Sequence, residues 1–154
     1  MKKFPLTLKE SVPSPSLLLD TYKIESNIDR MISIAGENFR QRLRPHLKTH
    51  KMSNLTKIQI EKGINKFKAS TIKEAEMAAK LEAQDILLAH QPVGPNINRL
   101  KTLVENFPKT SFAAITDNIP TANAIAEKIG TPNQPFRLFI DINCGMNRTG
   151  ISFN

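Results

Sequence analysis

The sequence predicts an α/β fold with a parallel sheet, and two observations support this prediction. Six short runs of apolar or β-prone residues recur along the chain, as expected of strands buried on both faces of a parallel sheet. Segments with helical periodicity separate these runs, so that strands and helices alternate. The predicted strands are residues 16–20, 42–49, 66–70, 85–90, 111–116 and 136–143. Such alternation is typical of a doubly wound open sheet or of part of a (β/α)8 barrel.

The predicted helices are identified by their caps as well as by their apolar stripes. Asp20 or Thr21 can cap the first helix, and Ser53 can cap the second. Thr71 and Glu74 have the spacing of a capping box at the start of the third. The five predicted helices are residues 22–35, 53–62, 71–81, 96–107 and 120–129. No Gly-x-Gly-x-x-Gly motif follows the first predicted strand, which weakens the nucleotide-binding form of the open sheet.

Length and composition indicate the class of protein and its compartment. The 154 residues, 40% of them hydrophobic, suffice for one domain with a buried core. No stretch approaches the ~18 consecutive apolar residues of a membrane helix, and the basic start lacks the apolar block of a secretory signal. Cys144 is the single cysteine, which excludes an intramolecular disulfide and fits a reducing compartment. We therefore expect a cytoplasmic protein with no membrane partner.

The charge balance favours a solvated surface over a nucleic-acid interface. The chain carries 22 Lys and Arg residues against 14 Asp and Glu residues, a net charge of +8. Such an excess can indicate polyanion binding, but here the basic residues are spread along the chain. The one dense basic patch, residues 40–51, has no interleaved aromatic residues and no zinc-finger spacing. We therefore expect no nucleic-acid partner.

The second predicted strand carries the most informative side chains. Alternate residues of a strand share a face, so Arg44, His46, Lys48 and His50 should point the same way. Such a row is costly inside a sheet core unless it lines a polar site. Positive neighbours and partial burial would favour the neutral, nucleophilic form of the Lys48 amine. A neutral lysine at the carboxyl end of a parallel strand is suited to forming a Schiff base with a carbonyl.

Two other interpretations of this row stay open on the residues alone. His46 and His50 have the spacing of metal ligands on a helix, although Pro45 argues against a helix and no third ligand stands nearby. The strand can also be a phosphate-binding or solvated basic edge. Composition and spacing place the Schiff-base lysine only somewhat ahead of these.

The run Arg-Leu-Arg-Pro-His-Leu-Lys-Thr-His-Lys at residues 42–51 closely resembles the pyridoxal-phosphate motif of the D-threonine aldolase and D-serine dehydratase family. This family belongs to the alanine-racemase-like, fold-type III enzymes. Four further segments resemble the family's strands in the same order, namely residues 15–20, 66–76, 85–95 and 141–151. The resemblance implies a partial (β/α)8 TIM barrel of the alanine racemase N-terminal type, with about six β-α strands present.

The resemblance implies roles for particular residues. Lys48 occupies the first lysine position of the family's Arg-Pro-His-x-Lys-Thr-His-Lys motif, which implies that it is the catalytic lysine and forms the internal aldimine with pyridoxal phosphate. Arg148, within Gly-Met-Asn-Arg-Thr-Gly, is implied to bind the cofactor near its phenolate oxygen and to keep that oxygen anionic. His46 lies one strand alternation before Lys48, so we expect it in or just behind the cofactor site.

Four other polar residues near predicted strand ends are interpreted as structural. Cys144 has no histidine and carboxylate arrangement to activate it and is expected to be a small residue near a glycine turn. His90 can be a polar loop group that faces the barrel mouth, but a surface histidine at a strand end is the favoured interpretation. Asp117 and Asn118 are expected to form a turn and a helix cap.

The family's chemistry implies a lyase of the D-threonine aldolase type, which cleaves D-3-hydroxy amino acids to glycine and an aldehyde. The alternatives are a D-serine dehydratase or amino-acid racemase on the same scaffold, or a non-catalytic module that binds the cofactor or a partner. The resemblance also implies a homodimer and a divalent metal ion whose ligands lie in a C-terminal β-domain. No residues matching those ligands occur in this sequence.

The resemblance also changes the interpretation of the chain's length. We expect residues 1–154 to be the N-terminal part of a pyridoxal-phosphate-binding (β/α)8 barrel, with the C-terminal β-domain absent. A closed barrel has eight strands and typically at least ~200 residues. We therefore expect unpaired edges at the first and sixth strands. We also expect poor cofactor binding and no activity for this chain alone.

Overall fold

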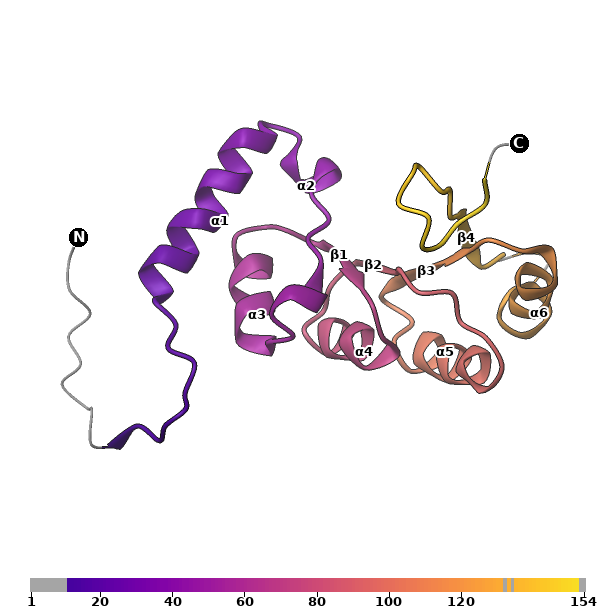
Figure 1. The fold of residues 1–154 in the computed structure, drawn as a ribbon, viewed down its shortest axis with the longest axis horizontal. Helices are drawn as coiled ribbons and strands as arrows, with labels where there is room; N and C mark the ends of the chain where they lie inside the picture. The colour runs from indigo at the N-terminus through magenta and orange to yellow at the C-terminus, as the bar shows by residue number, and fades with distance from the viewer. Residues whose placement is uncertain (1–10, 132, 134, 153–154) are drawn as a thin grey trace.

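The computed structural model describes residues 11–131, 133 and 135–152; residues 1–10, on which part of the compartment prediction rests, lie outside it. Helices and strands alternate from β1 onward (Figure 1). The helices are α1 (Thr21–Ala35), α2 (Phe39–Arg42), α3 (Ser53–Glu61), α4 (Ile72–Lys80), α5 (Pro95–Asn106) and α6 (Ile119–Ile129). The strands are β1 (Lys66–Ala69), β2 (Asp85–Leu88), β3 (Ser111–Thr116) and β4 (Arg137–Ile140). No helix in the described part is long and apolar enough to cross a bilayer.

The four strands form one parallel sheet in the order β1-β2-β3-β4. Each strand therefore pairs with its neighbour in sequence, and a helix connects every pair. A doubly wound sheet reverses its strand order at a switch point, whereas a (β/α)8 barrel keeps sequential order throughout. This arrangement confirms the predicted α/β class and is that of a barrel segment.

The two faces of the sheet differ in chemistry because side chains alternate along each strand. Phe67, Ile86 and Phe112 are buried on the face that α3, α4, α5 and α6 cover (Figure 1). They belong to one apolar cluster that continues into these helices through alanines and leucines such as Ala78 and Leu100. The opposite face carries the charged side chains of Lys66, Lys68, Asp85 and Arg137.

The prediction of a strand at residues 16–20 is wrong. No described strand includes these residues, and Leu17, Leu18 and Leu19 are exposed. Their apolar character indicates β propensity, but a strand also needs a partner with free backbone groups. The neighbouring segment in the predicted strand order, residues 42–49, forms only one backbone bridge, between His46 and Lys68. It therefore presents no strand edge with which residues 16–20 could pair.

The prediction of a strand at residues 42–49 is also wrong, except at its centre. Backbone pairing consists of the His46–Lys68 bridge and a hydrogen bond from Lys68 N to the Pro45 carbonyl at 2.9 Å. Pro45 has no N–H to donate, which interrupts a ladder. The chain then turns into a 3-10 helix, Leu47–Thr49, whose Leu47 is fully buried. The free edges are therefore β4 and the irregular segment beside β1.

The helix caps mostly follow the predictions. The Asp20 side chain accepts a hydrogen bond from Lys23 N, and the Asn118 side chain accepts one from Thr121 N. Ser53 is instead the first residue of α3, because Met52 occupies the cap position.

The start of α4 has one of the two hydrogen bonds of the expected capping box. Thr71 Oγ1 accepts from Glu74 N at 3.1 Å, as a cap should. The Glu74 carboxylate accepts from Ser70 N at 2.8 Å instead of from Thr71 N, one residue earlier than in the usual box. Glu74 therefore holds the loop between β1 and α4.

Candidate functional site

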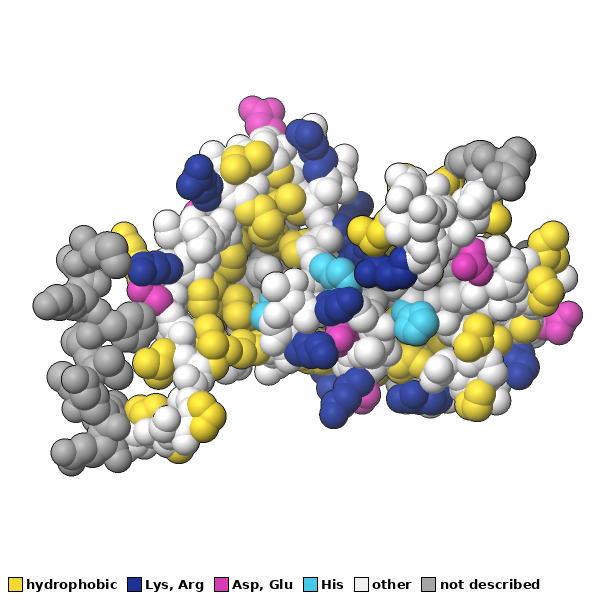
Figure 2. Space-filling view, in the orientation of Figure 1, with side chains coloured by type: hydrophobic (Ala, Val, Ile, Leu, Met, Phe, Trp, Pro, Cys, Tyr) yellow, Lys and Arg dark blue, Asp and Glu magenta, His cyan; other side chains and the backbone are white. Residues whose placement is uncertain are grey.

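A cavity of about 580 Å³ opens at the carboxyl ends of the strands. Lys48 and Arg148 both line it, although exactly one hundred positions separate them in the sequence. Active sites of (β/α)8 proteins lie at this end of the barrel. Figure 2 shows lysine, arginine and histidine side chains gathered near the centre of this view, beside the C-terminal loop. The remaining lining residues are Ser70, Ala89, His90, Gln91, Val93, Ile115, Thr116, Asp117, Asp141 and Thr149.

Lys48 reaches the cavity from the 3-10 turn, not from a strand. The predicted row of alternating side chains is therefore broken after His46, and the expected partial burial of Lys48 is wrong because this residue is exposed. Arg44 does not provide the expected positive neighbour either. Its guanidinium turns toward the amino end of the sheet, where it contacts Asp85.

Arg44, Asp85 and Arg137 form an ion cluster on the open face of the sheet. Asp85 Oδ1 lies 2.6 Å from Arg44 Nη1 and 2.9 Å from Arg137 Nη2. Burial opposes ionisation of Asp85, but the hydrogen bonds and charges of Arg44 and then Arg137 outweigh it and lower the pKa of the carboxyl. This cluster links the segment before the 3-10 helix to β2 and β4. No local sequence pattern indicates this cluster, because 41 and 52 positions separate Asp85 from its two partners.

His46 is not among the residues that line the cavity, but it contacts one of them, Ser70. Its Nδ1 lies 2.9 Å from the Lys68 carbonyl oxygen and 3.3 Å from Lys48 N. Its Nε2 lies 3.3 Å from Ser70 Oγ, which does line the cavity. Burial lowers the pKa of His46, and the Lys68 and Lys48 charges act in the same direction. The imidazole is therefore neutral near pH ~7.

His50 plays a structural part in the turn after Lys48. Its Nδ1 accepts a hydrogen bond from Met52 N at 3.1 Å, which orients the start of α3. Burial lowers the pKa of His50, so this imidazole is also neutral near pH ~7. No group of three or more His, Cys, Asp or Glu side chains in the described part of the chain could hold a metal ion.

Arg148 is presented by a closed loop after β4. Asn143 N donates to the Ile151 carbonyl and Ile151 N donates to the Asp141 carbonyl, both at 2.9 Å, so the two ends of the loop are joined. Gly150 has φ +93°, and a Cβ there would lie 2.6 Å from Asn143 N, which excludes other side chains. No ion pair among residues 11–131, 133 and 135–152 includes Arg148, so its guanidinium is available to the cavity.

Gln91 connects the loops that follow β2 and β3, and no sequence motif indicates this role. Its Oε1 accepts hydrogen bonds from Thr116 Oγ1 at 2.8 Å, Asp117 N at 2.9 Å and Asn118 Nδ2 at 3.2 Å. The hydrogen bond from Asn118 lowers the pKa of Asp117. Asn118 caps α6 as predicted, but Asp117 also lines the cavity and is more than a turn residue.

His90 and Cys144 complete the comparison with the predicted residues. His90 is exposed as expected, yet it lines the cavity together with Lys48. Cys144 is an exposed thiol whose Sγ lies 3.4 Å from the Ile142 carbonyl oxygen, which fits the structural interpretation.

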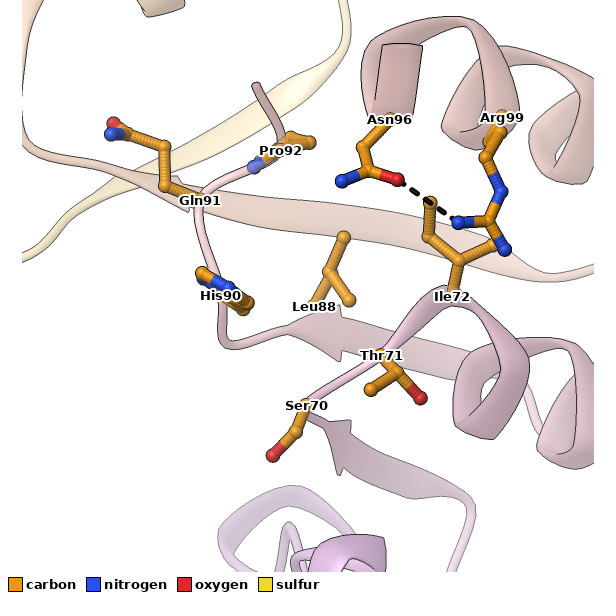
Figure 3. A pocket seen from close by; sticks show the side chains of 9 residues that line it. All are labelled: Ser70, Thr71, Ile72, Leu88, His90, Gln91, Pro92, Asn96 and Arg99. Atoms are coloured by element: carbon orange, nitrogen blue, oxygen red, sulfur yellow. Dashed lines mark hydrogen bonds between the residues drawn. The ribbon is translucent and has the colours of Figure 1, made fainter. Parts of the chain in front are cut away.

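A smaller pocket of about 150 Å³ adjoins the main cavity and shares Ser70, His90 and Gln91 with it. Figure 3 shows that its other walls come from the start of α4 and from α5, where Arg99 donates a hydrogen bond to Asn96 Oδ1 at 3.0 Å. The main cavity is the one into which both Lys48 and Arg148 are brought.

The donor set of the main cavity fits pyridoxal phosphate. A primary amine, Lys48, and a guanidinium, Arg148, are the groups that would hold an aldehyde and an anionic ring oxygen. The volume of about 580 Å³ lies within the ~300–1,000 Å³ range of small-molecule sites. Hydroxyl groups from Ser70, Thr116 and Thr149 complete a polar lining.

Comparison with characterised proteins identifies relatives with related activities. The chain is 25% identical over 141 residues to D-threonine aldolase of Arthrobacter sp, covering 92% of this chain and 36% of that protein. It is 28% identical over 145 residues to D-threo-3-hydroxyaspartate dehydratase of Delftia sp. (strain HT23), with the same coverage of both. It is 32% identical over 118 residues to D-serine dehydratase of Dictyostelium discoideum, covering 70% and 29%. The chain thus spans about a third of the length of these curated relatives.

The fold comparison agrees with the sequence comparison. The crystal structure of D-threonine aldolase from Filomicrobium marinum superposes with a TM-score of 0.80 at 25% identity, covering 93% of this chain and 38% of that one. The sequence profile of the alanine racemase N-terminal domain matches residues 19–154. This chain therefore belongs to the alanine racemase N-terminal domain family.

Proposed function

We propose that this chain is the lysine-bearing part of a pyridoxal-phosphate-dependent lyase of the D-threonine aldolase type, which cleaves D-3-hydroxy amino acids to glycine and an aldehyde. One observation carries the proposal: Lys48 and Arg148 line the same cavity at the carboxyl ends of the strands. The relatives that act on D-amino acids, including a D-threonine aldolase, support it.

Each of the two residues has a defined task in this proposal. Lys48 holds the cofactor through its amine, and the turn that carries it is anchored by the buried Leu47. Arg148 pairs with the anionic ring oxygen, and the closed 141–151 loop fixes its approach. When bound, pyridoxal phosphate supplies an electron sink for breaking a bond at the α carbon of an amino acid.

His46 has an indirect task, because it does not line the cavity. Its neutral ring contacts the Ser70 hydroxyl at 3.3 Å and the Lys68 carbonyl at 2.9 Å, so it braces the wall between Lys48 and β1. His90, Asp117 and Asp141 are further polar groups at the rim that can contact a bound amino acid.

A dehydratase acting on D-serine or a D-3-hydroxy amino acid is the second candidate. It is favoured by identities of 28% and 32% to two such enzymes, which are no lower than the identity to the aldolase. The two reactions share the amine and the guanidinium and differ in the bond that is broken.

Product analysis separates these functions in the protein made from the complete reading frame that contains this sequence. With pyridoxal phosphate and D-threonine, we expect glycine and acetaldehyde, and no product from the Lys48→Ala variant. Keto acid and ammonia from D-threonine or D-serine would favour the dehydratase instead. Lys51→Ala, which removes the other lysine of the motif, is the matched control and should keep activity.

A further inference from the structure

Ser70 and His46 form a hydrogen-bonded pair that connects the main cavity with the backbone of β1. Ser70 lines the cavity together with Lys48, and its Oγ lies 3.3 Å from His46 Nε2. The sequence gives no indication of this pair, because 24 positions separate the two residues.

The contacts of His46 determine which of its nitrogens carries the proton. Nδ1 lies 2.9 Å from the Lys68 carbonyl oxygen, which can only accept a hydrogen bond. If Nδ1 were unprotonated, two acceptors would face each other at this distance, which is unfavourable. Nδ1 is therefore the protonated nitrogen, and the longer contact from Lys48 N at 3.3 Å is not a hydrogen bond in this tautomer.

The charge state of His46 follows from its surroundings. Desolvation by burial is the largest influence and favours the neutral ring, as do the charges of Lys68 and Lys48. The hydrogen bond to the Lys68 carbonyl and the charge of Glu74 oppose them, and the net effect is a lowered pKa. A neutral ring with a protonated Nδ1 leaves Nε2 as an acceptor, so the Ser70 hydroxyl donates its single proton to Nε2.

This arrangement fixes what Ser70 offers to the cavity. Its proton is engaged by His46, so only its oxygen lone pairs remain for a ligand. The backbone of Ser70 is also held, because Ser70 N donates to the Glu74 carboxylate at 2.8 Å. Ser70 is thus a positioned acceptor that selects a hydrogen-bond donor.

We propose that Ser70, oriented by His46, is the site's receptor for a protonated primary amine, supplied either by Lys48 or by a bound amino acid. Figure 3 shows Ser70 at the end of β1, with its hydroxyl directed away from Arg99 and the smaller pocket. In this proposal, His46 is a positioning residue that acts through Ser70. The proposal deepens the proposed function, on which it rests for the identity of the ligand.

Nitrogen-15 NMR of the imidazoles tests the proposal in the 154-residue chain, which contains only three histidines. We expect the His46 spectrum to show a protonated Nδ1 and a hydrogen-bonded, unprotonated Nε2. Ser70→Ala should shift the Nε2 resonance toward that of a free acceptor, and Ser70→Thr should restore it. Thr149→Val, which removes another hydroxyl of the same cavity, should leave it unchanged. A protonated Nε2 in the wild-type chain would contradict the proposal.

Two arms identify the source of the amine. An amine that binds Ser70 polarises its hydroxyl and strengthens the bond to His46, so it moves the Nε2 resonance. Because the Lys48 charge also acts on His46 directly, Lys48→Ala is measured with and without Ser70→Ala, and a shift that requires the Ser70 hydroxyl assigns the amine to Lys48. A shift caused by adding D-threonine, but not by 3-hydroxybutyrate, which lacks the amine, assigns it to an amino acid. If neither change moves the resonance, the proposal is wrong. None of these readings requires pyridoxal phosphate, so they are independent of whether Lys48 binds the cofactor.

Discussion

The middle of the sheet combines continuous strand pairing with buried apolar side chains, whereas each flank lacks one of these features. One flank is joined by a single bridge, and the other, β4, pairs continuously with β3 but leaves apolar side chains exposed. At the centre, β1, β2 and β3 pair residue by residue, and Phe67 and Ile86 are completely buried. At one flank the segment before the 3-10 turn makes only the His46–Lys68 bridge, and at the other β4 exposes Phe139 and Ile140.

This difference shows where stability and chemistry reside. The centre contributes the apolar core together with Ser70, Gln91 and Thr116 in the cavity wall. The flanks contribute the two groups proposed to hold the cofactor, Lys48 and Arg148. Changes at the centre should therefore unfold the chain, and changes at the flanks should affect the site with little loss of stability.

The largest expected effect comes from truncating a buried aromatic residue at the centre. Phe67→Ala should lower the free energy of unfolding by about 3–5 kcal/mol, because it removes a fully buried ring and leaves a cavity. The matched flank variant is Phe139→Ala, whose side chain is 44% exposed and should cost far less. Urea unfolding measures both. Equal losses would show that the flank is packed as tightly as the centre.

An intermediate effect is expected at the ion cluster that spans the open face. Asp85→Asn weakens two charge-assisted hydrogen bonds, which predicts a loss of about 1.5–3 kcal/mol near neutral pH. Lys62, which pairs with Asp29 near the surface, provides the comparison: Lys62→Met should cost about 1 kcal/mol or less. A larger loss for Lys62→Met would place the main electrostatic contribution outside the sheet.

The same cluster predicts a pH dependence with a definite sign. The pKa of Asp85 is lower in the folded chain than in the unfolded chain, so at acidic pH the folded state binds fewer protons than the unfolded state does. Its stabilising contribution is present above the unfolded pKa of ~4 and is lost as the pH falls through the folded value. The difference in unfolding free energy between wild type and Asp85→Asn should therefore shrink on acidification. A difference that grows at low pH would contradict the assignment.

The smallest effects on stability are expected from two helix caps of the same kind. Thr71→Ala at the centre should lower the global free energy of unfolding by about 1 kcal/mol, because Glu74 N loses its acceptor. Asp20→Ala at the flank removes the acceptor of Lys23 N. We expect this change to speed hydrogen exchange in the first turn of α1 with little change in the global midpoint. A loss of global unfolding free energy as large as that of Thr71→Ala would show that α1 unfolds together with β1, β2 and β3, which would contradict the comparison.

The sequence predicted the central elements well because their determinants are local. The apolar or β-prone runs at residues 66–69 and 85–88 and the caps at Thr71 and Asn118 are visible within a few positions. The strand predicted at residues 16–20 failed because an apolar run shows propensity but not the presence of a partner. The second predicted strand keeps a single bridge at His46, because Pro45 on one side has no N–H to donate and the 3-10 helix begins at Leu47 on the other.

The candidate site was predictable in part for the same reason. Lys48 and Arg148 stand in recognisable motifs, and the structure brings both to one cavity. Ser70 and Gln91 were missed because their contacts join loops 24 to 27 positions apart. Such contacts depend on the order of strands in the sheet, which no local pattern specifies.

Localising the lysine that reacts with pyridoxal phosphate tests the central claim most directly. The 154-residue chain is incubated with the cofactor, reduced with borohydride and mapped by peptide mass spectrometry, so that even weak binding is trapped irreversibly. We predict a pyridoxyl group predominantly on Lys48. The amount of this label should fall in Arg148→Ala but stay unchanged in Arg99→Ala, since Arg99 lines the neighbouring pocket. A label spread evenly over Lys48, Lys51 and other exposed lysines would contradict the account.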